Sequence, residues 1–219
     1  MVLELLLPQR CVVCGALGVQ LCEPCLERLP RIAPPLCERC GTPTAWPVRR
    51  CRECAGRRIA FTTARSAVQY DDAVRALVAG WKERALRSLV RSAVALVVEV
   101  VPPPAANLIT FVPPDPDRRL SRGHHPPGQL AEELASSWEV PVGGLLRRRG
   151  AAKRQRGLSR TERRRNVAGA FVAPSAVPTS VVLVDDVFTS GSTANAAASA
   201  LRQAGARRVE VVTFARVVR

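Results

Sequence analysis

The chain has 219 residues, of which 47% are hydrophobic and 23% are charged, a composition typical of globular rather than disordered proteins. Lys and Arg number 33 against 18 Asp and Glu, so the net charge of +15 favours partners that carry phosphate. All the cysteines lie between Cys11 and Cys54, and the two histidines are adjacent. The adjacent histidines exclude any metal site that needs several separated imidazoles.

The N-terminal segment resembles a signal peptide poorly, because its short apolar run contains Glu4 and lacks a basic flank. The most apolar later segment, 93–101, contains Glu99 and runs into three prolines. That segment is too short and too charged to span a bilayer. We therefore expect a cytoplasmic protein without a membrane span, in which reduced cysteines bind metal rather than form disulfides.

The cysteines form four C-x-x-C pairs, namely Cys11/Cys14, Cys22/Cys25, Cys37/Cys40 and Cys51/Cys54. Two such pairs supply the four thiolates of a tetrahedral zinc site, so eight ligands predict two Zn²⁺ ions. Sequential sites, each closing a short loop, are favoured over a cross-braced pairing, which the spacing also allows. We expect structural zinc rather than redox chemistry, because the segment lacks a thioredoxin-like βαβ context. Gly15 and Gly41 follow two of the pairs, where the turn favours positive φ.

Beyond the cysteines, strand and helix patterns alternate along the chain. Strands are predicted at 61–70, 108–112, 142–146, 181–184 and 209–214, and helices at 74–81, 86–97, 129–138 and 192–204, the first capped by Asp71 or Asp72. The alternation predicts an α/β fold with a parallel sheet flanked by helices. We expect a small Cys-rich zinc module over residues 1–57 and the α/β domain over residues 58–219.

The most informative segment is 181–193, with the sequence VVLVDDVFTSGST. An apolar strand delivers Asp185 and Asp186 to its carboxyl end, where open α/β sheets bind ligands. A loop of small hydroxyl residues around Gly191 then opens a helix, and the N–H groups of such a loop bind phosphate. Two carboxylates beside a phosphate site are suited to binding ribose hydroxyls, or Mg²⁺ held with them. We favour this interpretation over the alternative that the two acids form a solvated turn.

This segment resembles the phosphoribosyl pyrophosphate (PRPP) signature of the type I phosphoribosyltransferases. The resemblance implies that Asp185 and Asp186 contact the ribose of PRPP, which we expect to bind with Mg²⁺. Among the residues of the motif, Asp186 is the one that we expect to accept a proton. The resemblance also implies that the following loop holds the 5-phosphate through Thr189, Ser190, Gly191, Ser192 and Thr193. A Walker A loop is excluded, because no Lys follows the glycine.

Nearly the whole chain resembles the ComF family, in which a Cys-rich double zinc ribbon precedes a phosphoribosyltransferase-like domain. The likeness includes the Val112-Pro113-Pro114 turn, Trp81-Lys82 at a helix end, and the segment 166–171. It implies a pyrophosphate loop with the candidates Pro113, Pro114, Arg118, Arg119 and Arg122, and a link to competence and DNA uptake. His124 and His125 stand where the family often has an aromatic residue and Asn.

The segment between positions 147 and 165 contains ten basic residues and a single acidic residue, Glu162. In related transferases the corresponding region is a mobile loop that closes over pyrophosphate. The residues of this chain that we expect in such a loop are Arg149, Lys153, Arg154 and Gln155. Three interpretations remain open: a solvated charged surface, pyrophosphate closure, and contact with the DNA backbone. The aromatic content of 4% offers little surface for stacking the bases of single-stranded DNA.

Two hypotheses about function follow. The first is a phosphoribosyltransferase, a pentosyl-group glycosyltransferase that uses PRPP and Mg²⁺ and an acceptor that the sequence does not identify. The second is a binding protein that senses PRPP or handles single-stranded DNA with other competence proteins, without turnover. The sequence leaves both open and does not fix the oligomeric state.

Overall fold

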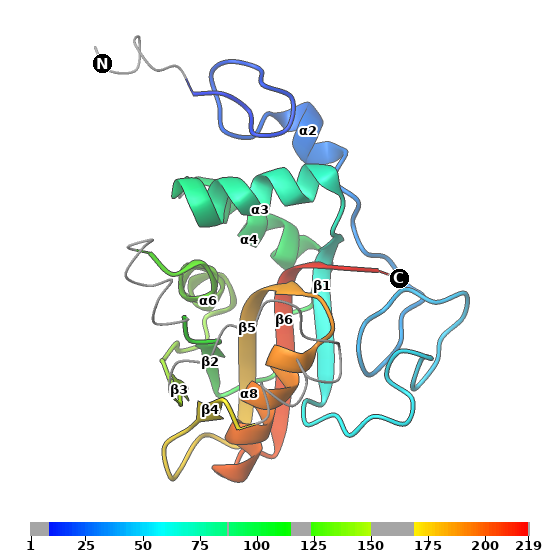
Figure 1. Ribbon diagram of the computed structural model, residues 1–219, viewed down its shortest axis with the longest axis vertical. Helices are drawn as coiled ribbons and strands as arrows, with labels where there is room; N and C mark the ends of the chain where they lie inside the picture. Colours follow the sequence, from blue (N-terminus) through cyan, green and yellow to red (C-terminus); the bar gives the residue numbers. More distant parts are fainter. Residues whose placement is uncertain (1–8, 87, 115–123, 150–168, 219) are drawn as a thin grey trace, which may run out of the picture.

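The computed structural model describes residues 9–86, 88–114, 124–149 and 169–218, and its centre is a four-stranded parallel sheet (Figure 1). The strands are β1 (Thr63–Gln69), β2 (Leu108–Phe111), β5 (Ser180–Phe188) and β6 (Arg208–Arg216). Their order in the sheet is β1-β6-β5-β2, and each neighbouring pair is parallel. The predicted fold class, a parallel α/β sheet behind a Cys-rich module, is confirmed.

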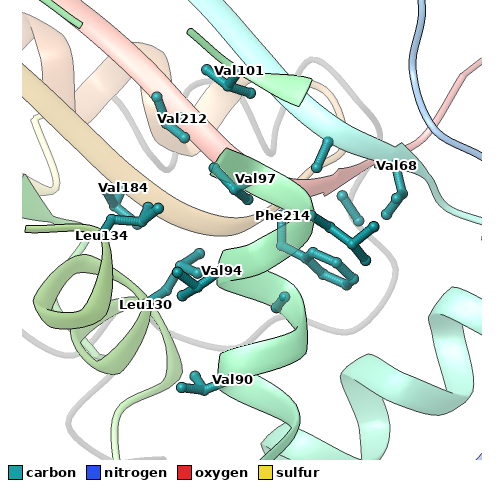
Figure 2. Close-up of a cluster of buried hydrophobic side chains, with 14 of the residues drawn as sticks. Val68, Val90, Val94, Val97, Val101, Leu130, Leu134, Val184, Val212 and Phe214 are labelled. Carbon is teal, nitrogen blue, oxygen red and sulfur yellow. The ribbon is translucent and has the colours of Figure 1, made fainter. Parts of the chain in front are cut away.

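The sheet is buried on both faces. Along β5, Val182 and Val184 pack against one hydrophobic cluster, whereas Val181 and Leu183 pack against the other. Figure 2 shows the first cluster, where Val94 and Leu130 from the covering helices meet the strands. Burial of alternate residues on opposite faces explains why the sequence of β5 reads as a continuous apolar run.

Helices cover the two faces unequally. One face is covered by α3 (Asp72–Arg84), α4 (Ser88–Val100) and α6 (Pro126–Trp138), and the other by α8 (Ser192–Gln203) (Figure 1). The α3 helix begins where Asp71 accepts a hydrogen bond from the Val74 N–H at 2.8 Å, so Asp71 rather than Asp72 is the cap. Among the described residues, no helix is both long and apolar enough to cross a membrane.

The predicted strand at 142–146 is wrong. Val142 makes only an isolated bridge to Ile109, and Gly143 and Gly144 follow it without side chains to pack. The chain instead forms the short antiparallel pair β3 (Arg147–Arg148) and β4 (Phe171–Val172). These two strands flank the basic segment, of which residues 150–168 lie outside the described residues.

The cysteines lie in two segments in different places, which we call the first ribbon (residues 11–25) and the second ribbon (residues 37–54). The first ribbon contains most of α2 (Glu23–Glu27), and Val12 and Leu21 pack against the cluster under α3 and α4. The second ribbon lies beside the outer edge of β1 (Figure 1), where the Ala64 N–H donates to the Arg39 carbonyl at 2.9 Å. The edge strand is therefore covered by the chain itself.

Candidate functional site

The cysteine sulfurs form two groups of four, and the pairing is sequential. One group is Cys11, Cys14, Cys22 and Cys25, and the other is Cys37, Cys40, Cys51 and Cys54. The Sγ–Sγ distances are 3.6 Å for Cys14–Cys22, 3.6 Å for Cys37–Cys54 and 3.4 Å for Cys40–Cys51. A tetrahedral site with Zn–S bonds of about 2.3 Å separates its sulfurs by about 3.8 Å, so both groups fit Zn²⁺.

Each site has a turn glycine in the left-handed region, as predicted. Gly15 has φ 78° and Gly41 has φ 71°. The surroundings of the two glycines differ. A Cβ added at Gly15 would meet no atom within 4 Å, whereas one at Gly41 would lie 2.3 Å from the Ala64 carbonyl oxygen of β1. The second ribbon is therefore fitted closely to the sheet.

A cavity of about 440 Å³ opens at the carboxyl ends of β2 and β5. It brings together the paired carboxylates, both ends of the hydroxyl loop and the Pro113-Pro114 turn. Its lining residues are Lys82, Val112, Pro113, Pro114, His124, His125, Pro126, Pro127, Arg148, Asp185, Asp186, Val187, Thr189 and Thr193. Two cations, Lys82 and Arg148, join the predicted residues there.

Lys82 forms an ion pair with Asp186, with 2.7 Å between Nζ and Oδ2. The end of α3 is fixed by the buried Trp81, whose Nε1 donates to Gln129 Oε1 of α6 at 3.2 Å. Only 22% of the Lys82 side chain and 12% of the Asp186 side chain are exposed, so solvent screens the pair weakly. Sequence reasoning noted Trp81-Lys82 as a family motif but did not place Lys82 in the site.

Asp185 has a different environment from its neighbour. Burial, and secondarily the charge of Asp186, raises the pKa of Asp185 to about 7. The Asp186 N–H, which donates to Asp185 Oδ1 at 2.9 Å, and the nearby Lys82 act in the opposite direction. Near neutral pH, Asp185 can therefore take up or release a proton.

The hydroxyl loop joins β5 to the N-terminus of α8. Gly191 is the N-cap residue, with φ 69°, and a Cβ there would lie 2.5 Å from Cζ of Phe188. The side chain of Ser190 faces that of Ser192, with 2.8 Å between the two Oγ atoms, and also accepts from the Ser192 N–H. The loop thus presents hydroxyls and the first amides of a twelve-residue helix, which suits a phosphate group.

The two histidines lie at the entry to α6. His125 Nδ1 accepts from the Gly128 N–H at 3.2 Å, which explains why α6 begins at Pro126, before the predicted start at residue 129. His124 Nε2 lies 2.9 Å from the Trp81 carbonyl oxygen. Both rings thereby connect α6 to the lining of the cavity.

The basic candidates divide into described and undescribed residues. Arg148 lines the cavity, with its guanidinium 5.0 Å from the centre of the Phe171 ring, whereas Arg149 is exposed just outside β3. The other candidates lie outside the described residues: Arg118, Arg119, Arg122, Lys153, Arg154 and Gln155.

Comparison with known proteins gives a family for the N-terminal module, since residues 2–55 match the double zinc ribbon domain. The chain is 27% identical to Competence protein F of Haemophilus influenzae, over 94% of this chain and 96% of that protein. These two matches confirm the resemblance to the ComF family. Two solved structures are similar to parts of this chain. One is the glutamine PRPP amidotransferase of B. subtilis, complexed with ADP and GMP (23% identity, TM-score 0.38), where the match covers 57% of this chain but only 26% of that one. The other is TT1426 of Thermus thermophilus (22% identity, TM-score 0.36), where the match covers 58% of this chain and 83% of that one.

Proposed function

We propose that this ComF-like chain binds PRPP with Mg²⁺ in the 440 Å³ cavity and transfers the phosphoribosyl group to an acceptor. One observation carries the proposal: the cavity joins a carboxylate pair, a hydroxyl loop at a helix N-terminus, and two cations. A sugar that carries phosphate at both ends matches this set of groups. Its ribose faces the carboxylates, and its phosphates face the loop and the cations.

Each part of the cavity has a distinct role in this proposal. The 5-phosphate is held by the loop of Thr189 to Thr193 and the first N–H groups of α8. Asp185 and Asp186 accept hydrogen bonds from the ribose hydroxyls. Lys82 and Arg148 line the same cavity and offset the negative charge of the pyrophosphate, together with the Pro113-Pro114 turn.

The reaction breaks the bond between C1 of the ribose and the pyrophosphate oxygen and forms a bond from C1 to the acceptor. Pyrophosphate leaves with the electron pair, and the acceptor loses a proton. The ionised form of Asp185, with a pKa of about 7, suits the role of proton acceptor better than Asp186, which is paired with Lys82. This assignment replaces the expectation from sequence that Asp186 takes the proton.

The donor set also suits Mg²⁺, which prefers oxygen ligands from one or two carboxylates together with substrate phosphates. In this site the oxygen of Asp186 that Lys82 does not contact would hold it, which leaves Asp185 as the proton acceptor. The bound ion would neutralise charge on the departing pyrophosphate.

The likeness to Competence protein F supports a place for this activity in DNA uptake. A second candidate function, a PRPP sensor or a single-stranded DNA handler without turnover, is favoured by the basic segment that begins at Arg147 and Arg148. A protein of this kind would use the same cavity but would lack an acceptor site.

The test is calorimetric binding of PRPP to the full chain in MgCl₂, followed by assay of pyrophosphate release with nucleobases and with single-stranded DNA. The double variant Asp185→Asn/Asp186→Asn should bind PRPP roughly 100-fold more weakly, because two hydrogen bonds to charged groups are lost. Asp72→Asn, which changes an exposed acid at the start of α3, is the matched control. Binding without pyrophosphate release favours the sensor, and wild-type protein that fails to bind PRPP contradicts both the transferase and the PRPP sensor.

A further inference from the structure

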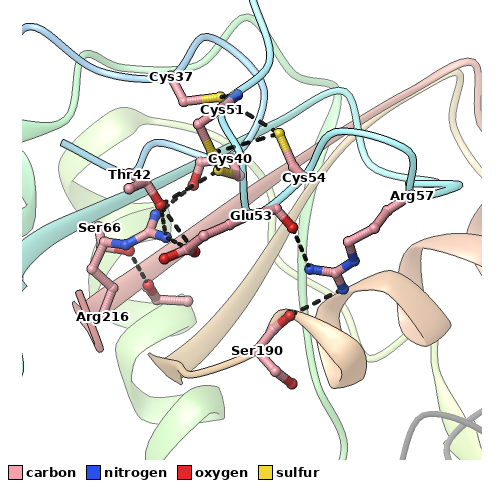
Figure 3. A network of polar contacts seen from close by, with 11 residues as sticks. Cys37, Cys40, Thr42, Cys51, Glu53, Cys54, Arg57, Ser66, Ser190 and Arg216 are labelled. Atoms are coloured by element: carbon pink, nitrogen blue, oxygen red, sulfur yellow. Dashed lines mark hydrogen bonds and ion pairs between the residues drawn. The ribbon is translucent and has the colours of Figure 1, made fainter. Parts of the chain in front are cut away.

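Two arginines lie between the second ribbon and the region of the hydroxyl loop, 189–193, and both contact the second ribbon in Figure 3. The first is Arg216, at the end of β6, whose side chain is fully buried. Its guanidinium donates to the Cys40 carbonyl and to Thr42 Oγ1, and lies 3.8 Å from Glu53 Oε2. All three partners belong to the second ribbon, and Cys40 and Glu53 belong to its two C-x-x-C turns.

The same guanidinium reaches the loop on its other side. Its central carbon lies 4.9 Å from the centre of the Phe188 ring, a cation–π contact. The Phe188 ring in turn fills the space beside Gly191, where a Cβ would lie 2.5 Å from it. Arg216 therefore contacts the Phe188 ring, and Phe188, which also packs edge-on against Phe61, occupies the space beside Gly191.

Arg57 makes a second connection just after the last cysteine. Its guanidinium donates to the Glu53 carbonyl at 3.3 Å and to the Ser190 carbonyl at 3.1 Å (Figure 3). Close by, the Ala60 N–H donates to Asn195 Oδ1 in the first turn of α8 at 2.7 Å. Arg57 thus joins a turn of the second site to the hydroxyl loop, and Ala60 joins the segment after the ribbon to the first turn of α8.

We infer that the second zinc site is a positioning element for the phosphate loop, and that Arg57 and Arg216 transmit the geometry of its C-x-x-C turns. Thiolates that hold zinc fix both turns, and hence the carbonyls of Cys40 and Glu53 that the two arginines contact. Loss of that zinc frees these carbonyls, and the loop then loses the geometry that binds phosphate. This role rests on the proposed function for its ligand, but the order of the loop can be measured without any ligand.

The decisive comparison removes one C-x-x-C pair from each ribbon of the full chain. Cys51→Ser/Cys54→Ser abolishes the second site, and Cys11→Ser/Cys14→Ser is the matched control for the first. Zinc content should fall from two ions to one in each variant. Amide hydrogen exchange of peptides that cover residues 188–195 should become faster only in the second-site variant. Its affinity for PRPP should fall about tenfold, within the usual range of coupling between two sites.

A milder pair of variants covers the case in which the second-site variant unfolds. Arg57→Ala removes the hydrogen bond to the Ser190 carbonyl, whereas Arg58→Ala removes a neighbouring exposed charge and is the control. Arg57→Ala should bind PRPP severalfold more weakly, with faster exchange in the loop and with both zinc ions retained, and Arg58→Ala should match the wild type.

The inference is overturned if loop exchange and PRPP affinity match the wild type in a folded second-site variant, or if Arg57→Ala behaves like Arg58→Ala. Equal acceleration in the two ribbon variants also overturns it, since the effect would then be general destabilisation. Failure of the wild type to bind PRPP contradicts the proposed function, whereas ligand-free exchange still decides the positioning role.

Discussion

The two ribbons have the same ligands and the same C-x-x-C spacing, yet they contact different parts of the molecule. The first ribbon places apolar side chains such as Val12 and Leu21 against the helices α3 and α4. The second ribbon places backbone carbonyls against Arg57 and Arg216, which reach the phosphate loop. The zinc ligands therefore specify the ribbon itself, whereas the residues between and after them specify what the ribbon supports.

The largest expected effect comes from the two turn glycines, which match in position and φ. Gly41→Ala should lower the free energy of unfolding by about 4 kcal/mol, because its Cβ would lie 2.3 Å from a backbone oxygen of β1. Gly15→Ala should cost about 1 kcal/mol, the strain of a positive φ alone. Urea denaturation of both variants measures the difference. Equal losses in the free energy of unfolding would show that the second ribbon is not packed more closely against the sheet than the first ribbon is against its neighbours.

The next largest effect on stability concerns Asp185, one of the two carboxylates that line the cavity. The pKa of Asp185 is raised to about 7 from its ordinary value of 3.8, so the native protein holds a proton that the unfolded chain releases between these values. The wild type should therefore lose stability as pH rises through this range. Asp185→Asn removes the titration and should be more stable than the wild type by about 2 kcal/mol above pH 7, with no gain near pH 4.

Urea denaturation at several pH values measures this gain. Asp186→Asn is the comparison, because it gives up the ion pair with Lys82 and also removes the charge that secondarily raises the pKa of Asp185, so its gain above pH 7 should be smaller than that of Asp185→Asn. The difference between Asp185→Asn and its parent should be the same in a Cys11→Ser/Cys14→Ser background, so a difference that changes there would mean that the first ribbon also reaches the carboxylates.

Lys82 tests that possibility directly, because it lies on the helix that the first ribbon contacts. Val12 of that ribbon lies close to Gly80, and Lys82 follows soon after Gly80 on α3 and lines the cavity. Lys82→Met should weaken PRPP binding about tenfold, the loss of one charge-assisted hydrogen bond. Lys82→Arg retains the charge and should recover most of the affinity. If calorimetry finds that both variants bind PRPP with the affinity of the wild type, Lys82 does not contact the phosphates of PRPP.

The sequence predicted the sheet, the zinc pairing and the carboxylate motif, because each depends on local spacing or on a continuous apolar strand. It missed contacts between distant segments. Nothing in the sequence around Arg216 indicates that this residue, in an apolar strand, is buried against a zinc turn and an aromatic ring. The ion pair of Lys82 and Asp186 likewise joins the end of a helix to the end of a strand, which only the packing of α3 on α6 brings together.

The smallest effect tests the link between the first ribbon and α4. Arg31 follows that ribbon and pairs with Glu99, at 2.7 Å, while also donating to the Leu26 carbonyl. Since 52% of the Glu99 side chain is exposed, Glu99→Gln should cost only about 0.5 kcal/mol in urea denaturation. The exposed Glu133→Gln on α6 is the control, and neither variant should change PRPP affinity or the exchange of the loop. A change in the loop caused by Glu99→Gln would mean that the first ribbon communicates with the site through α4, and the contrast between the two ribbons would then be lost.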